Sequence, residues 1–378
     1  MVTALSACSL FRVSDAMGAR PVDQSSHSNQ DLGHYREGRF ISQPAIGDMS
    51  WGKIGRITAR FMFGDKVDPA PTSLLPTVPL NAASFDSPPP DGDYRVTWLG
   101  HATAMIELDG LRIMTDPVFS DRASPFANMG PKRFQPMPIA LADVPDLDVV
   151  IISHDHYDHL DMAAIKEMHP RVGRFFVPLG VGEHLRKWDV PAEKITELDW
   201  WQDAPVSPEV TLIATPARHF SGRGMFDKNK TLWASWVVSG SQHQLFFSGD
   251  TGMHEGFNDI GEKYGPFDLA MIENGAYDKD WPDVHMSPEE TVQAAKMLKA
   301  KRVLPIHWGT FDLANHAWYE PANRVKELAN EHNVPLAQPR PGEAIGPHLP
   351  WPVAQWWKQP QNADKEIATA PAMQGATN

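Results

Sequence analysis

The feature that most constrains this chain is a run of metal-binding side chains directly after the apolar stretch 148–152. Four candidate ligands lie within six residues: His154, His156, Asp158 and His159. At this spacing they cannot all point the same way on a regular strand or helix. On a loop they divide, so that His154 and His156 face one metal ion and Asp158 and His159 face another. Such a division is what a centre with two metal ions requires.

Three more candidate ligands stand where other apolar stretches end. His219 follows residues 211–218, Asp250 follows 245–249, and His307 follows 302–306. Open α/β sheets collect their ligand sites at the carboxyl ends of strands. We therefore expect these side chains to converge with the first cluster on one metal centre.

Composition narrows the chemistry of such a centre. The 378 residues include sixteen His and one Cys, so neither a disulfide framework nor a cysteine-based zinc site can form within the chain. The net charge is −13, and no basic stripe of the kind that binds nucleic acid is present. No apolar run reaches the roughly 20 residues that span a bilayer. A site built from His and carboxylates remains open.

The chain divides into an arm, a domain and a tail. Residues 1–92 are polar and Pro-rich, and only Trp51, Ile54, Ile57 and Phe61 show helical spacing. This arm either packs on the domain or forms an element that faces a membrane or the substrate. Residues 93–350 form one catalytic domain, which starts with expected strands at 95–99, 104–108 and 111–115 and a hairpin turn at Asp109-Gly110. Residues 351–378 are expected to be a disordered tail.

The ligand pattern resembles that of the metallo-β-lactamase superfamily. Shorter matches resemble the branch of N-acylphosphatidylethanolamine-hydrolysing phospholipases D, and the resemblance runs from about residue 94 to 345. The segments that carry it include Trp98-Leu99-Gly100-His101-Ala102-Thr103, Thr115-Asp116-Pro117, Gly130-Pro131-Lys132-Arg133-Phe134, Leu198-Asp199-Trp200-Trp201, Gly265-Pro266-Phe267-Asp268-Leu269 and Ile306-His307-Trp308-Gly309-Thr310-Phe311.

This resemblance implies an α/β fold, the αββα sandwich, with two mixed β-sheets face to face and helices outside. It also implies two Zn²⁺ ions, although the same ligands suit Fe or Mn. The first ion would be held by His154, His156 and His219. The second would be held by Asp158, His159 and His307, with Asp250 bridging both.

The resemblance also implies a catalytic role for His285, beside the ligands Asp158 and Asp250. His285 precedes Ser287, Pro288 and Glu290, which predict a capped helix running to about Lys299. In the resembling family the matching His lies near the substrate phosphate. An ordinary His at a helix entry is the alternative.

Three other residues near the motifs are candidates for supporting roles. His101 either orients a metal ligand or is a buried His bonded to the backbone. Asp116 is a further candidate for orienting a ligand. Tyr157 either faces the substrate or only packs.

The implied activity is that of a dizinc phosphodiesterase of phospholipase D type. It would hydrolyse N-acylphosphatidylethanolamine-like phospholipids to N-acylethanolamine and phosphatidate by hydroxide attack on phosphorus. The alternatives are a metal-dependent lactonase or other small-molecule hydrolase, a nuclease, and a metal-binding scaffold without catalysis. β-Lactam hydrolysis is disfavoured because the only Cys lies far outside the motifs.

The expected partners are a phospholipid or another phosphodiester substrate, a membrane surface contacted peripherally and a second copy in a homodimer, but no nucleic acid. Leu5-Ser6-Ala7-Cys8 resembles a bacterial lipobox without the upstream part of a signal peptide. If the natural start lies further upstream, Cys8 would anchor a lipoprotein in the cell envelope. Otherwise the protein is expected in the cytoplasm or at the membrane periphery.

Overall fold

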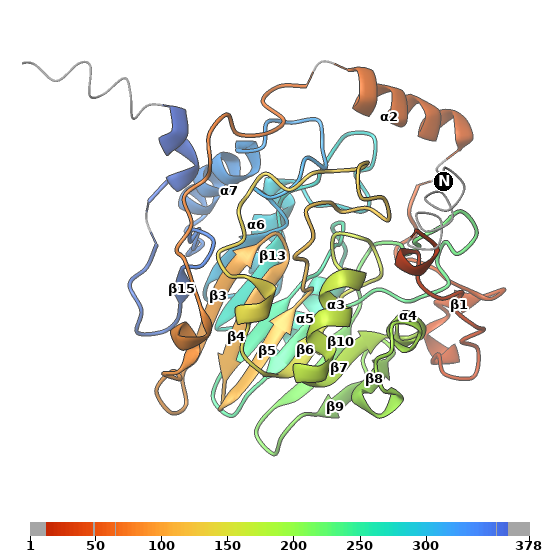
Figure 1. The fold of residues 1–378 in the computed structure, drawn as a ribbon, viewed down its shortest axis with the longest axis horizontal. Helices are drawn as coiled ribbons and strands as arrows, with labels where there is room; N and C mark the ends of the chain where they lie inside the picture. The colour runs from red at the N-terminus through yellow and green to blue at the C-terminus, as the bar shows by residue number, and fades with distance from the viewer. Residues whose placement is uncertain (1–12, 48–49, 65, 353, 362–378) are drawn as a thin grey trace, which may run out of the picture.

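The computed structural model describes residues 13–47, 50–64, 66–352 and 354–361. Its central feature is a pair of β-sheets with helices on their outer sides (Figure 1). The expected lipobox at Cys8 and residues 362–378 of the expected tail lie outside the described residues.

The first sheet has seven strands and contains the predicted hairpins. In spatial order its strands are β15 (Ala344–Ile345), β3 (Tyr94–Gly100), β4 (Thr103–Leu108), β5 (Leu111–Thr115), β6 (Leu147–Ile151), β7 (Val172–Pro178) and β8 (Ile195–Leu198). The pairs from β15 to β5 are antiparallel, and those from β5 to β8 are parallel. Asp109 has a φ of 49° in the turn between β4 and β5, and Gly110 is the second residue of this turn. The three strands expected between residues 95 and 115 are confirmed.

The second sheet has six strands and is also mixed. Their order is β14 (Val303–Ile306), β13 (Leu269–Glu273), β12 (Gln244–Phe247), β11 (Ser235–Ser239), β10 (Thr211–Thr215) and β9 (Asp203–Pro205). The pairs β12–β13 and β13–β14 are parallel and the others antiparallel. The apolar stretches that precede the candidate ligands in the sequence are therefore strands β6, β10, β12 and β14.

Three apolar clusters define four layers. The largest lies between the sheets and joins Val96, Ile106 and Val149 of the first sheet to Trp236 and Phe247 of the second. A second cluster packs the outer face of the first sheet against α3 (Met162–Met168) and α4 (Gly182–Lys187). A third packs the outer face of the second sheet against α5 (Gly256–Lys263) and α6 (Pro288–Met297). This arrangement is the predicted αββα sandwich.

The predicted helix starts are confirmed at two places. Ser287 and Glu290 form a reciprocal capping box at the start of α6, which ends at Met297 rather than Lys299. The arm contains α2 (Trp51–Phe63), where helical spacing predicted a helix, and α2 lies at the edge of the molecule, away from the sheets (Figure 1). The last α-helix, α7 (Glu320–Glu331), packs against α6. None of the helices within the described residues is long and apolar enough to span a bilayer.

The two ends of the expected domain differ from the sequence-based boundaries. We expected a disordered tail from residue 351, but Trp356 and Trp357 are both about 1% exposed and belong to the central core. The Trp356 ring stacks on Trp308, at 5.3 Å between centroids. The arm is also joined to the domain, since β1 (Tyr35–Arg36) and β2 (Arg39–Phe40) form a small hairpin whose Phe40 lies in the same core.

Candidate metal centre

The seven predicted ligands come together where four strands end. His154, His156, Asp158 and His159 lie on the loop between β6 and α3, and His219, Asp250 and His307 follow β10, β12 and β14. The φ of His307 is +65°, a left-handed conformation that turns the chain immediately after β14. Ligand atoms of these residues, together with those of His101, Glu273 and His285, form three overlapping groups, and within each group all the ligand atoms lie within 4.8 Å of one another.

The first group consists of His154, His156, His219 and Asp250. Nε2 of His154 lies 2.8 Å from Nδ1 of His156, and Nε2 of His219 lies 3.3 Å from the same atom. Asp250 Oδ2 is 3.9 Å from His154 Nε2 and 3.8 Å from His219 Nε2. Three imidazole nitrogens and one carboxylate oxygen therefore face a common point, which is the donor set that Zn²⁺ accepts.

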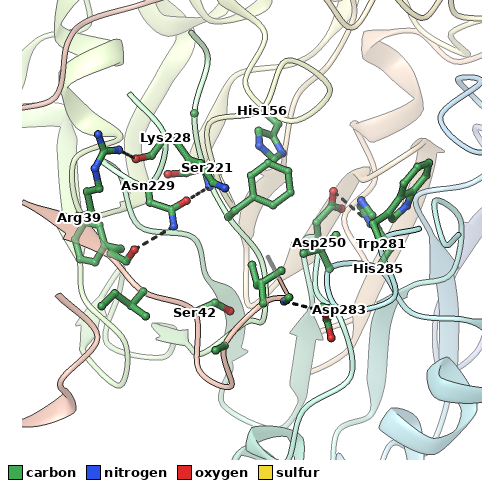
Figure 2. A pocket seen from close by; sticks show the side chains of 18 of the residues that line it. Arg39, Ser42, His156, Ser221, Lys228, Asn229, Asp250, Trp281, Asp283 and His285 are labelled. Atoms are coloured by element: carbon green, nitrogen blue, oxygen red, sulfur yellow. Dashed lines mark hydrogen bonds and ion pairs between the residues drawn. The ribbon is translucent and has the colours of Figure 1, made fainter. Parts of the chain in front are cut away.

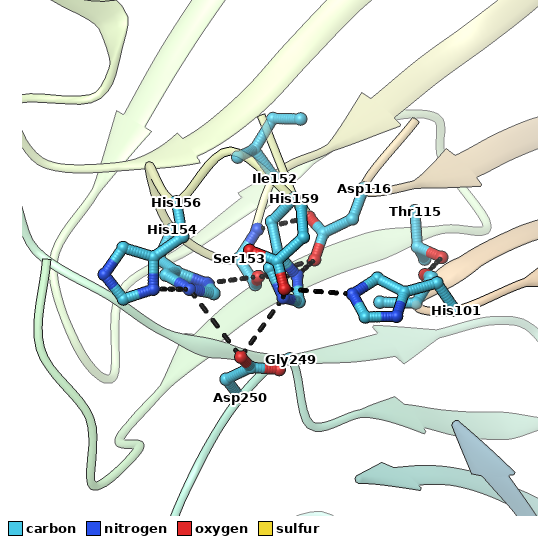
Figure 3. Close-up of polar contacts among 12 residues, drawn as sticks. His101, Thr115, Asp116, Ile152, Ser153, His154, His156, His159, Gly249 and Asp250 are labelled. Atoms are coloured by element: carbon cyan, nitrogen blue, oxygen red, sulfur yellow. Dashed lines mark hydrogen bonds and ion pairs between the residues drawn. The ribbon is translucent and has the colours of Figure 1, made fainter. Parts of the chain in front are cut away.

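The second group places the predicted second set around the other side of Asp250 (Figure 3). Asp250 Oδ2 is 3.1 Å from Nε2 of both His159 and His307. Asp158 Oδ2 lies 3.3 Å from His307 Nε2 and 3.6 Å from His159 Nε2. One oxygen of Asp250 is thus within 4 Å of four imidazoles, two from each group, as a bridging carboxylate needs.

Buried atoms without hydrogen-bond partners show that these residues fit metal ions. His159 Nε2 and Asp250 Oδ1 are buried and have no hydrogen-bond partner among the described residues. Buried polar atoms in native proteins are normally paired, because desolvation of an unpaired one costs about 1–3 kcal/mol. Unpaired atoms that face neighbouring ligands are satisfied when a cation binds between them. The chemistry of the donor set agrees with this fit.

The opposite nitrogens of two ligands are held by hydrogen bonds that leave Nε2 free. His159 Nδ1 donates to Asp116 Oδ2 at 2.7 Å, and Asp116 also accepts from Ser153 N and Oγ (Figure 3). His219 Nδ1 donates to the carbonyl of Val284 at 3.0 Å. Such partners set the tautomer and orientation of a metal-binding imidazole. Asp116 therefore has the orienting position that the sequence offered for it.

The local electrostatics favours a cation. Burial lowers the pKa of His154 and His219 well below the usual value, so both imidazoles are neutral at pH 7. Burial alone would raise the pKa of Asp250, but His159 and His307 outweigh it and hold this pKa well below the usual range. Burial would lower the pKa of His307, yet Asp250 and other carboxylates raise it to about 10. The carboxylates of the centre thus stabilise positive charge beside them, here as the proton on His307, and a metal ion would displace that proton when it binds.

Two neighbouring residues have side-chain roles that the sequence left open. His101 is 1% exposed, and its Nε2 lies 3.1 Å from Asp158 Oδ2, so it orients that carboxylate. Burial, with the charge of His307, lowers the pKa of His101 to about 3 and keeps it neutral. Tyr157 turns away from the ligands, because its hydroxyl donates to the carbonyl of Arg223 at 2.7 Å. Tyr157 is therefore a packing residue.

His285 lies at the edge of the centre, as the resemblance implied. Its Nδ1 is 4.0 Å from Asp250 Oδ2, and its ring stacks on that of His307 at 5.4 Å between centroids. The same Nδ1 forms a short contact with Glu273, a fully buried residue at the end of β13. Sequence reasoning missed Glu273. The available signal was a carboxylate that ends an otherwise apolar strand between Asp250 and His307.

A cavity of about 1400 Å³ opens onto the centre. Its floor includes Asp158, Asp250, His285 and His307, and its opposite wall comes from the arm, residues 36–47. Figure 2 shows Arg39 and Lys228 across the cavity from Asp250 and His285. The apolar lining residues are Phe40, Ile41, Ala45, Ile46, Phe220, Met225, Phe226, Ala276, Trp281, Val284 and Leu313. The sequence left two alternatives for the arm, packing on the domain or facing a membrane or the substrate. It did not predict that the arm would line this cavity.

The comparisons with known proteins agree with this geometry. The family model of the beta-lactamase superfamily domain matches residues 111–308. An uncharacterised protein of Mycobacterium tuberculosis is 42% identical over 352 residues, which cover 91% of each chain. The N-acyl-phosphatidylethanolamine-hydrolyzing phospholipase D 1 of Caenorhabditis elegans is 40% identical over 269 residues, 68% of this chain and 74% of that protein.

Among solved structures, a metallo hydrolase of Ignicoccus hospitalis, Igni18, matches with a TM-score of 0.54 at 22% identity. It covers 68% of this chain, and all of its own chain is matched. At this identity the likeness shows the fold alone. Together with the family model and the sequence relatives, it establishes that the chain belongs to the metallo-β-lactamase superfamily of metal-dependent hydrolases, in the branch that includes N-acylphosphatidylethanolamine-hydrolysing phospholipases D.

Proposed function

We propose that this protein is a dizinc phosphodiesterase of phospholipase D type that hydrolyses N-acylphosphatidylethanolamine-like lipids to N-acylethanolamine and phosphatidate. The observation that carries the proposal is the cavity, which joins the His/Asp centre to a long apolar wall. Its volume of about 1400 Å³ exceeds the roughly 300–1000 Å³ of an ordinary small-molecule pocket. A substrate with acyl chains and a phosphodiester would place the acyl chains along the apolar wall and the phosphodiester at the His/Asp centre.

The metal ions would be held as the two groups are arranged, one by His154, His156 and His219 and one by Asp158, His159 and His307, with Asp250 between them. Zn²⁺ at such a centre supplies a hydroxide nucleophile and neutralises charge on the phosphoryl oxygens. Asp158 and Asp250 would act as anionic ligands whose charge offsets part of that of the metal ions and whose contacts with the neighbouring imidazoles fix the ligand geometry. His285 stands at the cavity edge, where it can reach an oxygen of the phosphate.

The cavity walls favour an anionic lipid over a small neutral ester. Arg36, Arg39, Lys53 and Lys228 line it together with Glu37 and Asp283, and Arg39 and Lys228 lie across the cavity from Asp250 and His285 (Figure 2). Met225 and Phe226 also line it and are 83% and 81% exposed. Exposed apolar side chains beside basic residues suit the interface of an anionic bilayer. We propose that the protein contacts a membrane peripherally through these exposed apolar and basic side chains and takes its substrate from that membrane.

The test is hydrolysis of N-acylphosphatidylethanolamine in mixed micelles by the purified protein with two equivalents of zinc. Both products should appear in equal amounts, and His285→Ala should lower turnover far more than it lowers zinc content. Activity confined to lactones or to RNA would overturn the lipid assignment. Active protein that contains one metal ion or none would overturn the two-metal arrangement.

A further inference from the structure

The metal loop, residues 153–161, is held in place by one buried arginine. Arg223 is 5% exposed and lies on the loop of residues 221–229, several of which line the cavity (Figure 2). Its guanidinium donates to the carbonyl of Asp155 at 2.5 Å and to that of Leu160 at 2.9 Å. It also donates twice to the carbonyl of Ala16, at 2.7 Å from Nη2 and 3.2 Å from Nε. One side chain therefore joins three segments that are far apart in the sequence.

The two carbonyls of the metal loop that Arg223 contacts enclose candidate ligands of both metal ions. Between them lie one predicted ligand of the first ion and two of the second, namely His156, Asp158 and His159. Because both ends of this short segment are anchored to the same guanidinium, the positions of the three ligands relative to one another are restricted. Arg223 is thus placed to act on both ions, although it is not itself a candidate ligand.

The side chain of Asp155 makes a second connection between the same two parts of the chain. Its Oδ1 accepts from the N–H of Gly222 at 2.8 Å, and its Oδ2 accepts from Oγ1 of Thr231 at 2.8 Å. His184 Nε2, on α4, lies 3.4 Å from the same Oδ2. Asp155 is 1% exposed and belongs to none of the groups of candidate ligands among the described residues. Its carboxylate therefore anchors the loop and leaves the binding of ions to its neighbours.

A guanidinium suits this position better than an ammonium. Its five N–H donors lie in one plane and point in fixed directions, so one group can hold carbonyls of three segments apart at set positions. The rings of Tyr157 and Trp188 lie 4.1 Å and 5.2 Å from its central carbon and pack against it. A lysine ammonium is a single charged point on a flexible chain and cannot reproduce this arrangement.

We propose that Arg223 and Asp155 are positioning residues that hold the metal loop in the arrangement that binds two metal ions, before either ion is present. This role rests on the metal centre and is independent of which substrate is hydrolysed. Loss of a residue that orients metal ligands typically lowers metal affinity about 10–100-fold. Zinc affinity and the motion of the metal-free loop are therefore the quantities to measure.

Arg223→Lys keeps the charge and removes the planar set of donors. We expect both stepwise zinc affinities, measured in the full-length protein by competition with a chelator, to fall about 10–100-fold. Two zinc ions should still bind when zinc is in excess. In the metal-free protein the amide of Leu160, which donates to the carbonyl of His156 at 2.8 Å, should exchange with deuterium about tenfold faster.

The matched control for this change is Arg171→Lys. Arg171 also donates to two backbone carbonyls, but it lies directly before β7, at the edge of the sheet opposite the metal loop. Its replacement should lower the melting temperature and leave both zinc affinities at wild-type values.

A second pair of variants tests the contacts of Asp155 without changing a charge. Thr231→Val keeps the shape of the side chain and removes the hydroxyl that donates to Asp155. We expect zinc affinity to fall about tenfold, at the lower end of the range for such a contact. The control is Thr215→Val on β10, where the hydroxyl is equally buried and has no hydrogen-bond partner within the described part of the chain. Its zinc affinity should equal that of the wild type.

Four results would contradict the proposal. Wild-type zinc affinity in Arg223→Lys would refute the role of Arg223, and wild-type affinity in Thr231→Val would refute that of Asp155, which remains testable if Arg223→Lys fails to fold. A loss confined to one of the two ions would show that Arg223 does not restrain the whole segment between the two carbonyls. An equal loss of affinity in Arg171→Lys would reduce the effect to general stability. A wild type that bound no zinc would overturn the metal centre itself, and the positioning role with it.

Discussion

The floor and the arm wall of the cavity are built in opposite ways. On the floor, Asp250 and His307 are 4% and 2% exposed and follow strands of the core. On the arm wall, Arg36 and Arg39 are exposed and belong to a two-stranded hairpin outside the sandwich. The residues of the floor belong to the sandwich, whereas those of the arm wall belong to a hairpin that packs against the sandwich.

The arm is attached by the buried apolar side chain of Phe40 and by a few polar contacts. His34 Nε2 pairs with Asp199 Oδ1 at 2.7 Å, and both side chains are fully buried. Nearer the centre, the N–H of Gly47 donates to Asp283 at 2.9 Å, and Arg218 donates to the carbonyl of Ala45 at 3.0 Å. This difference between the two regions suggests that the floor sets the reaction and the arm selects what reaches it.

The largest effect is expected at the centre of the floor. Asp250→Asn removes the carboxylate that lies within 4 Å of four imidazoles. Bound zinc should fall sharply and kcat should drop more than about 10³-fold, because hydrolysis depends on the metal ions. Metal analysis of the purified variant, together with turnover, measures both. Treatment of the wild type with a chelator should give the same loss.

The control for this change is Asp109→Asn in the turn between β4 and β5. Asp109 has a φ of 49°, which Asn also adopts readily, and within the described part of the chain its carboxylate hydrogen-bonds only to Ser241. Zinc content and kcat should stay at wild-type values. An Asp250→Asn protein that kept two zinc ions and full activity would remove Asp250 from the centre.

A smaller effect is expected at Asp116, which hydrogen-bonds to the predicted metal ligand His159 and is not itself a ligand. Asp116→Asn weakens the hydrogen bonds from His159 Nδ1 and Ser153 while leaving every ligand in place. Loss of such a partner typically lowers metal affinity about 10–100-fold. Competition with a zinc chelator measures this change. An unchanged affinity would mean that the loop geometry alone orients His159.

The two regions also differ in how far the sequence predicts them. The floor was predictable because each ligand follows an apolar strand, and strand ends in such sheets share one edge. The arm wall was not, because residues 35–47 have few apolar positions and no periodicity. Their contacts are with residues far along the chain, such as Asn229 and Asp283. Trp356 was missed for a related reason, since a tryptophan in a polar, Pro-rich context gives no periodic signal of burial.

Loosening the arm should change substrate selection and spare the chemistry. His34→Ala removes one hydrogen-bond partner of the buried Asp199, which keeps the backbone N–H groups of Asn29 and Trp200, and such a loss costs about 1–3 kcal/mol. We expect cleavage by a protease within residues 35–47 to become faster. We also expect kcat/KM for the long-chain lipid to fall about tenfold, equivalent to about 1.4 kcal/mol of binding. For bis(p-nitrophenyl) phosphate, which does not need the apolar wall, the change should stay within about twofold.

The matched control is His27→Ala on the same arm, where the side chain is exposed and, among the residues that the structure describes, hydrogen-bonds only to Ser26. It should alter neither protease sensitivity nor the ratio of the two activities. An equal loss on both substrates in His34→Ala would show that the arm supports the centre itself. In that case the division between floor and wall would be wrong.

The smallest effect is expected from a single charge on the arm wall. Arg39 faces the cavity from β2 and is exposed, so its attraction for an anionic lipid is screened by water and salt. Exposed charge pairs contribute about 0.2–1 kcal/mol, so Arg39→Gln should lower kcat/KM about two- to threefold at low ionic strength. The difference from wild type should vanish in high salt. A loss that was large or insensitive to salt would mean that Arg39 binds the substrate directly, and the arm would then be part of the binding site rather than a charged border around it.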